Sequence, residues 1–116
     1  SVSAFSPIAN PSDCPWGEKA LGGYLGDDKS AWQAYDAAIL LAEKQHYIPL
    51  LVEQGRADQF LEEQLKPQAL INAAQKSDTQ LTLNMHEGYD HSYFFIASFI
   101  EEHLQFHASY LGIGGL

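Results

Sequence analysis

The chain has 116 residues, of which 46% are hydrophobic and 18% are charged, a composition typical of one small globular domain and not of a disordered segment. Its net charge of −9 argues against binding to nucleic acid or to an anionic membrane surface, since both require clustered Lys and Arg. No apolar run approaches the ~20 residues of a membrane span. Cys14 is the only cysteine, so an internal disulfide is excluded, which suits the cytoplasm.

The first residues already have the alternating pattern of a strand. Ser1 to Phe5 alternates, and Ser6-Pro7 ends the run. A strand at the first residue, without an initiator methionine, predicts that the chain begins inside a larger protein. A short helix is expected from Pro15 to about Leu21, with Gly22-Gly23 as its stop.

The next two elements are a helix and a buried strand. Ser30-Ala31-Trp32-Gln33 has the pattern of a capping box, which predicts a helix that is capped again at Asp36 and runs to about Lys44. Ile48 to Val52 is a continuous apolar run, as in strands buried on both faces, and such a strand needs neighbours on both sides.

The second half repeats this alternation. Phe60 to Leu65 reads as irregular or as one helical turn, and a helix follows from Pro67 to about Lys76. Gln80 to His86 is apolar on one face only, which favours a strand at or near a sheet edge, and the last helix begins near Ser92. We therefore predict an α/β fold with three parallel strands, near 1–6, 47–53 and 80–86, and helices on both faces.

An acid and a histidine follow two consecutive predicted strands. Asp58 lies in the loop after Ile48–Val52, and His91 lies in the loop Glu87-Gly88-Tyr89-Asp90-His91 after the next strand. Ligands bind at the carboxyl ends of strands in open α/β sheets, and the order acid then histidine is that of α/β-hydrolases. The nucleophile elbow G-x-S-x-G is absent from the sequence. We therefore predict Asp58 and His91 as catalytic residues and place the nucleophile outside this chain.

Other interpretations remain open for these residues. A single loop histidine is more often a surface residue, and Asp58 alone is a good turn former. Asp90 is the rival acid, although adjacent side chains orient each other poorly and Asp90 also suits capping of the last helix. Trp16 follows a loop at the carboxyl end of a strand, which makes it a candidate for a pocket wall.

No metal site is predicted. His103 and His107 have the i, i+4 spacing of two zinc ligands, but the helix lacks the H-E-x-x-H pattern, so we interpret both as packing or boundary residues of the helix. Cys14 has no histidine near it in sequence, and a lone cysteine is usually inert.

Several stretches resemble the S-formylglutathione hydrolases, the esterase D family. They are Ser-Ala-Phe-Ser-Pro-Ile-Ala-Asn-Pro at 3–11, Cys-Pro-Trp-Gly at 14–17, Gly-Tyr-Leu-Gly at 23–26, Asp-Gln-Phe-Leu at 58–61 and Glu-Gly-Tyr-Asp-His-Ser-Tyr at 87–93. The resemblance implies that residues 1–116 are the carboxyl-terminal part of a single α/β-hydrolase domain. By position, Asp58 matches the triad acid, His91 the triad base, and Trp16 part of the pocket lining.

The resemblance also implies an activity and partners. These enzymes cleave S-formylglutathione to glutathione and formate in formaldehyde detoxification, hydrolyse small esters, and need no cofactor or metal. The expected partners are a small thioester or ester substrate, the amino-terminal half of the same protein, and a second copy in a homodimer. The alternative is a non-catalytic protein, either a truncated α/β-hydrolase fragment or a binding module, and the sequence upstream of Ser1 distinguishes it from the enzyme.

Overall fold

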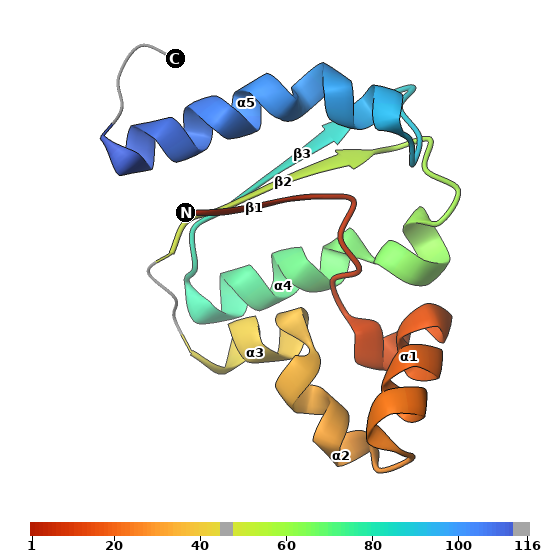
Figure 1. Cartoon of the computed structure of the whole chain (residues 1–116). Helices are drawn as coiled ribbons and strands as arrows, with labels where there is room; N and C mark the ends of the chain where they lie inside the picture. The colour runs from red at the N-terminus through yellow and green to blue at the C-terminus, as the bar shows by residue number, and fades with distance from the viewer. Residues whose placement is uncertain (45–47, 113–116) are drawn as a thin grey trace.

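The computed structural model describes residues 1–44 and 48–112, and within them the chain forms a three-stranded parallel sheet (Figure 1). The strands are β1 (Val2–Phe5), β2 (Leu50–Gly55) and β3 (Leu81–His86), in that order across the sheet. The parallel direction, the central place of the second strand and the edge place of the third are as predicted. Residue 47, where the second strand was expected to begin, lies outside the described residues.

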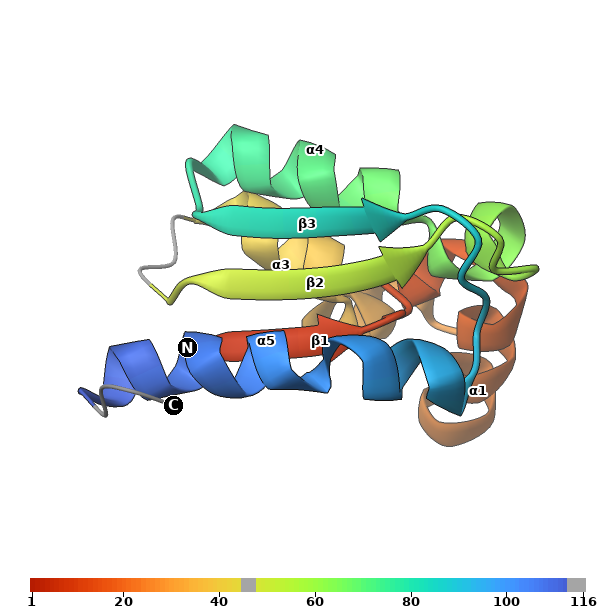
Figure 2. The same ribbon diagram turned by 90° about the horizontal axis from the view of Figure 1, so that it is seen from above.

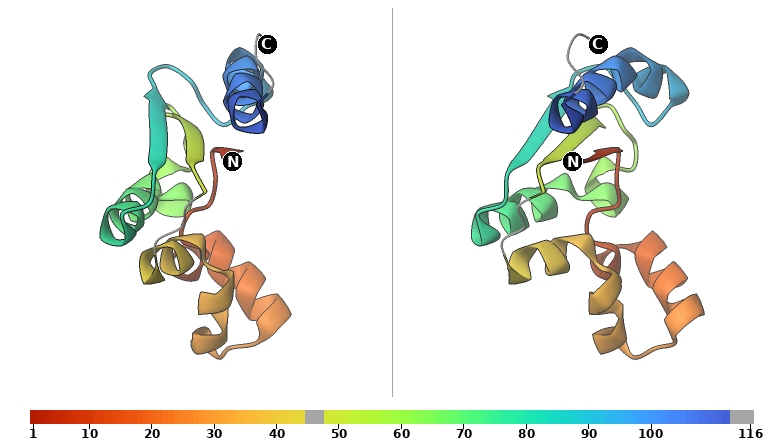
Figure 3. Two further views of the ribbon diagram at one scale, coloured as in Figure 1. Left: turned by 90° about the vertical axis from the view of Figure 1, so that its left-hand side faces the viewer. Right: turned by 60° about the vertical axis from the view of Figure 1, so that its left-hand side comes forward.

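Helices cover both faces of the sheet, as expected for an α/β fold. α3 (Ala37–Glu43) and α4 (Pro67–Ser77) pack on one face, and α5 (Tyr93–Leu111) lies across the other (Figure 3). The buried core lies between the sheet and the first two of these helices. It comprises Ala9, Ala38, Leu41, Val52, Leu70, Ala73 and Ala74.

The first helix is longer than predicted. After a short 3-10 turn, η1 (Pro11–Asp13), α1 runs over Pro15–Leu25, because Gly22-Gly23 does not stop it. A Cβ atom on Gly22 would lie 3.7 Å from the Trp32 ring, an ordinary van der Waals contact. The helix ends at Gly26, whose φ of +85° favours glycine and whose N–H donates to the Gly22 carbonyl.

The capping box at Ser30 is also wrong. α2 (Lys29–Trp32) begins two residues earlier than a cap at Ser30 implies, and its cap is Asp28, whose carboxylate accepts from the backbone N–H of Ser30 at 3.1 Å and from the Ser30 hydroxyl. A 3-10 turn, η2 (Gln33–Tyr35), then leads to α3. The second cap at Asp36 is confirmed, since its side chain accepts from the N–H of Ile39.

The central strand ends at Gly55, three residues beyond the apolar run that predicted it. Glu53, Gln54 and Gly55 belong to β2 and are buried, although the end of the apolar run at Val52 placed them in the loop. After β2 and the Asp58 loop comes η3 (Leu61–Leu65), a single π-helical turn, and Pro67 then begins α4.

Because the three strands are parallel, their carboxyl ends lie at the same end of the sheet. Figure 2 shows the loops that follow β2 and β3 leaving on the same side, where each folds back over the sheet. This arrangement brings the loop with Asp58 beside the loop with His91. Among the described residues, no helix has both the length and the apolar character required to cross a bilayer.

Candidate functional site

The Asp58 side chain is fixed by the loop that follows β2. Its carboxylate is wholly buried, with 0% of the side chain exposed. Oδ1 accepts from the backbone N–H of Phe60 at 2.8 Å, and Oδ2 accepts from the side-chain amide of Gln54 at 3.1 Å. Both carboxylate oxygens are therefore held by donors from the same loop and strand.

The His91 loop is held against the end of β2 by close backbone packing. The N–H of Ala57 donates to the carbonyl of Tyr89 at 3.0 Å, and the N–H of Arg56 donates to the carbonyl of His86 at 2.9 Å. A Cβ atom on Gly55 would lie only 2.2 Å from the Tyr89 oxygen, so only glycine permits this approach. Backbone hydrogen bonds and this close approach thus hold the Asp58 loop and the His91 loop together.

His91 and Asp58 are in direct contact. Nδ1 of His91 lies 2.8 Å from Oδ2 of Asp58, although 33 residues separate them in the chain, so the acid and the histidine that follow consecutive strands are hydrogen-bonded to each other. Because a carboxylate oxygen accepts, Nδ1–H donates and Nε2 is left as the basic ring nitrogen. Nε2 has no hydrogen-bond partner among the described residues, and 40% of the His91 side chain is exposed.

Asp90 has neither of the roles weighed for it. The carboxylate on His91 belongs to Asp58, so Asp90 is not the rival acid. It does not cap α5 either, because the residue at the cap position is Ser92, whose side chain makes no capping hydrogen bond. Asp58 forms the hydrogen bond because it approaches His91 from another loop, whereas the side chains of adjacent residues orient each other poorly.

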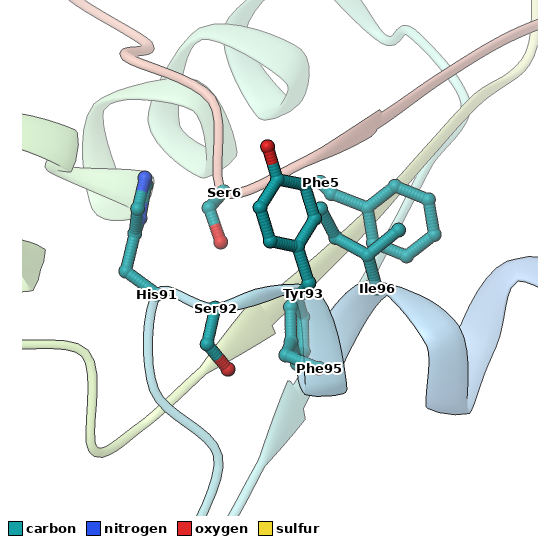
Figure 4. Close-up of a pocket in the computed structure, with 7 residues that line it drawn as sticks. All are labelled: Phe5, Ser6, His91, Ser92, Tyr93, Phe95 and Ile96. Atoms are coloured by element: carbon teal, nitrogen blue, oxygen red, sulfur yellow. The ribbon is translucent and has the colours of Figure 1, made fainter.

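His91 lines a pocket between the end of β1 and the start of α5. The pocket has a volume of about 380 Å³, within the range of small-molecule sites. Figure 4 shows His91 on one side, Phe5 and Ile96 on the other, and Ser6 and Tyr93 between them. Ser6 adopts a φ of +49°, a strained value for a residue with a side chain, and such strain is found preferentially at functional sites.

Trp16 lies next to the site but does not line this pocket. Its ring centroid is 4.5 Å from that of Phe60, and the Phe60 ring meets the His91 ring edge-on at 5.5 Å. The backbone N–H of Trp16 donates to the side chain of Gln64, which ties α1 to η3. The Phe60 ring therefore lies between Trp16 and His91 and contacts both.

A second polar cluster, centred on Glu53, lies under α5, and sequence reasoning missed it. The Glu53 carboxylate is wholly buried and accepts from His103 at 2.9 Å, from Asn84 at 2.8 Å and from His86 at 3.1 Å. The His103 ring also stacks on Phe5 with centroids 3.9 Å apart. The sequence signal was present, because an acid directly follows the apolar run Ile48–Val52 while histidines lie on the apolar stripe of the last helix.

The remaining candidates have structural contacts. His103 is buried on Glu53, and the two ring nitrogens of His107 bond to the hydroxyls of Ser1 and Ser3, so both histidines pack α5 on the sheet as expected. Cys14 is buried, with 1% of its surface exposed. In the part of the chain that the structure describes, no three His, Cys, Asp or Glu side chains are arranged to hold a metal ion.

Comparisons with known proteins point to one family. The family model "Esterase: Putative esterase" matches residues 1–106. The S-formylglutathione hydrolase of Arabidopsis thaliana is 49% identical over 112 residues, which cover 96% of this chain and 39% of that protein. A solved structure of an S-formylglutathione hydrolase from Agrobacterium tumefaciens matches with a TM-score of 0.88 and 47% identity, over 92% of this chain and 39% of that one. The chain thus spans about two fifths of the relatives it matches.

Proposed function

Because the chain belongs to the esterase family, we propose that it supplies the acid, Asp58, and the base, His91, of a serine esterase that hydrolyses S-formylglutathione. The single observation that carries the proposal is the bond of 2.8 Å between Nδ1 of His91 and Asp58, with Nε2 left free. The activity named for the two relatives is the source of the substrate. Residues 1–116 then form the carboxyl-terminal portion of one α/β-hydrolase domain.

The serine nucleophile is assigned to residues outside this sequence. No G-x-S-x-G turn is present, and Ser98 lies within α5 with its hydroxyl bonded to the Phe94 carbonyl. Among the described strands β1 pairs only with β2, so its other edge is available for further strands of the same protein. We assign that edge to the amino-terminal half. A homodimer and a cytoplasmic role in formaldehyde detoxification remain expectations.

The reaction is an acyl transfer in two steps. Nε2 of His91 takes the serine proton as the serine oxygen attacks the formyl carbon, and the C–S bond then breaks as His91 protonates the glutathione sulfur. In the second step Nε2 of His91 takes a proton from water as the water oxygen attacks the formyl ester, and it then gives this proton to the serine oxygen as the ester C–O bond breaks, which releases formate and restores the free serine. Asp58 keeps the proton on Nδ1 throughout and stabilises the imidazolium. Trp16 does not line the pocket that residues 1–116 form at His91, but its contact with Phe60 supports a place in the wall of the acyl or glutathione pocket of the complete enzyme.

Labelling with a fluorophosphonate tests where the nucleophile lies. The isolated 116-residue chain should remain unlabelled, and the full-length gene product should be labelled on a serine that precedes Ser1. Labelling of the isolated chain would overturn the assignment. An unlabelled and inactive full-length product would instead favour the non-catalytic module.

Substitutions in the full-length product test the roles of the two residues. His91→Ala should lower kcat by several orders of magnitude, and Asp58→Asn by roughly 10⁴, since the amide stabilises the wrong tautomer of the imidazole. Asp90→Asn is the matched control and should retain most of the activity, because Asp90 does not contact the ring. Equal losses for Asp58→Asn and Asp90→Asn would contradict the assignment.

A further inference from the structure

We propose that Gln54 is a positioning residue for the Asp58–His91 pair, and that its side-chain amide fixes the plane of the Asp58 carboxylate. Nε2 of Gln54 lies 3.1 Å from Oδ2 of Asp58, the same oxygen that accepts from His91. The kinetic consequence rests on the proposed function. The positioning role itself rests on the hydrogen bonds that the Gln54 amide makes in the structure.

The orientation of the Gln54 amide follows from its neighbours. Nε2 has two hydrogens, and they face the Asp58 carboxylate and the carbonyl of Gly55, which is also 3.1 Å away. Both neighbours are acceptors, so turning the amide around would place its oxygen against two other oxygens. The amide nitrogen must therefore point at the carboxylate.

The other end of the same amide is unsatisfied. Gln54 is 0% exposed, and its Oε1 accepts no hydrogen bond from any residue that the structure describes. A buried carbonyl without a donor destabilises the folded chain, and an apolar side chain of the same size would remove that penalty. Glutamine at this site is therefore poorly explained by packing, whereas the bond from its nitrogen to Asp58 explains it.

The contribution of Gln54 to the pair is geometric. The terminal torsion of an aspartate side chain is broad, so one donor does not fix the carboxylate plane. The N–H of Phe60 holds Oδ1, and Gln54 holds Oδ2. Without Gln54, Oδ2 would be held by His91 alone, and the carboxylate and the imidazole could turn together away from the reacting geometry.

Gln54→Met in the full-length product tests the proposal, because methionine keeps the length of the side chain and removes its donor. We expect kcat for S-formylglutathione to fall by about 10- to 100-fold, the usual effect of losing one hydrogen bond to a charged group, with KM unchanged. The downfield ¹H NMR signal of the His91 Nδ1 proton should broaden or shift. Gln54→Asn, whose amide lies one methylene short of Asp58, should show the same changes.

Ser77→Ala is the matched control. Ser77 is a buried residue at the end of α4 whose hydroxyl bonds to the Ala73 carbonyl and to Thr79, so its loss should lower stability but leave kcat and the proton signal unchanged. If both Gln54 variants melt earlier yet keep wild-type kcat and proton signal, Gln54 only packs and the proposal is wrong. If the wild type has no esterase activity, the proposed function fails, and the proton signal alone still decides the role of Gln54.

Discussion

Glu53 and His103 are 50 residues apart in the chain and meet beneath α5, with the carboxylate Oε2 2.9 Å from the imidazole Nε2. Glu53 also holds two side chains of β3, so one buried carboxylate joins the central strand, an edge strand and the last helix. The start of that helix forms a wall of the pocket with His91. The packing of α5 and the shape of the candidate site therefore depend on the same buried acid.

Glu53→Ala should destabilise the protein strongly. It leaves His103, His86 and Asn84 without their common acceptor in a buried site, and each lost partner costs about 1 kcal/mol or more, so the free energy of unfolding should fall by about 3 kcal/mol. Urea denaturation of the full-length product measures this. Glu102→Ala, an exposed acid next to His103 on α5, is the control and should change stability by less than about 0.5 kcal/mol. Equal effects would show that the Glu53 network is not stabilising.

Gly55→Ala should separate the two loops of the site. The added Cβ would meet the Tyr89 oxygen at 2.2 Å, so the His91 loop must move, and we expect a loss of about 2 kcal/mol in stability together with a lower kcat. Gly23→Ala is the control, because a Cβ there meets nothing within 4 Å and alanine favours the helix by about 0.5–1 kcal/mol. A crystal structure of Gly55→Ala with an unchanged distance between His91 and Asp58 would contradict the prediction.

Trp16→Ala should weaken substrate binding more than chemistry. The indole packs on Phe60 and not on the reacting nitrogen of His91, so KM should rise by about tenfold, corresponding to about 1.4 kcal/mol of lost apolar contact, while kcat changes little. Steady-state kinetics of the full-length product measures both constants. Tyr35→Ala, which removes an aromatic ring that is 63% exposed, should leave both unchanged. A fall in kcat alone would exclude a binding role for Trp16.

Asp28 should make the stability of α2 depend on pH. Hydrogen bonds from the Ser30 hydroxyl and then from its backbone N–H lower the pKa of Asp28 below its usual 3.8. A lowered folded-state pKa means that the cap stabilises the fold fully above the unfolded pKa and loses its effect as pH falls through the folded one. The stability difference between wild type and Asp28→Asn, which cannot titrate, should therefore be constant above about pH 5 and change below about pH 4. A difference that is flat down to pH 2 would contradict this.

The sequence predicted Asp58 and His91 as partners because hydrophobic patterns show which segments are strands and therefore which loops follow them. Both residues follow strands whose direction and neighbours were predicted, and parallel strands bring such loops together. Gln54 and Glu53 were missed for the opposite reason. A polar residue at the end of an apolar run looks like the first residue of a loop, and only the tertiary packing of α5 and of the Asp58 loop buries it.

Two local predictions, the helix cap at Ser30 and the helix stop at Gly22-Gly23, were wrong. Ser30 fits a capping box, but Asp28 two residues earlier is a competing acceptor, and the sequence does not show which of the two caps the helix. Gly22 and Gly23 were interpreted as a stop from their flexibility alone. In the structure the helix continues through both glycines to Leu25 and ends at Gly26, whose positive φ favours glycine.

Glu53, which binds His103 of α5, and Gln54, which binds Asp58, are adjacent residues at the end of β2. Adjacent side chains of a strand point to opposite faces of the sheet. A shift of β2 by a single residue would turn each side chain to the other face. In one direction the Gln54 amide would take the place of Glu53 under His103, and in the other the Glu53 carboxylate would face Asp58, where two like charges would repel. The register that pairs Glu53 with Phe5 and Asn84 across the sheet therefore also determines which side chain faces α5 and which faces Asp58. An insertion or deletion of one residue here would scramble both polar networks at once, whereas most single substitutions damage only one.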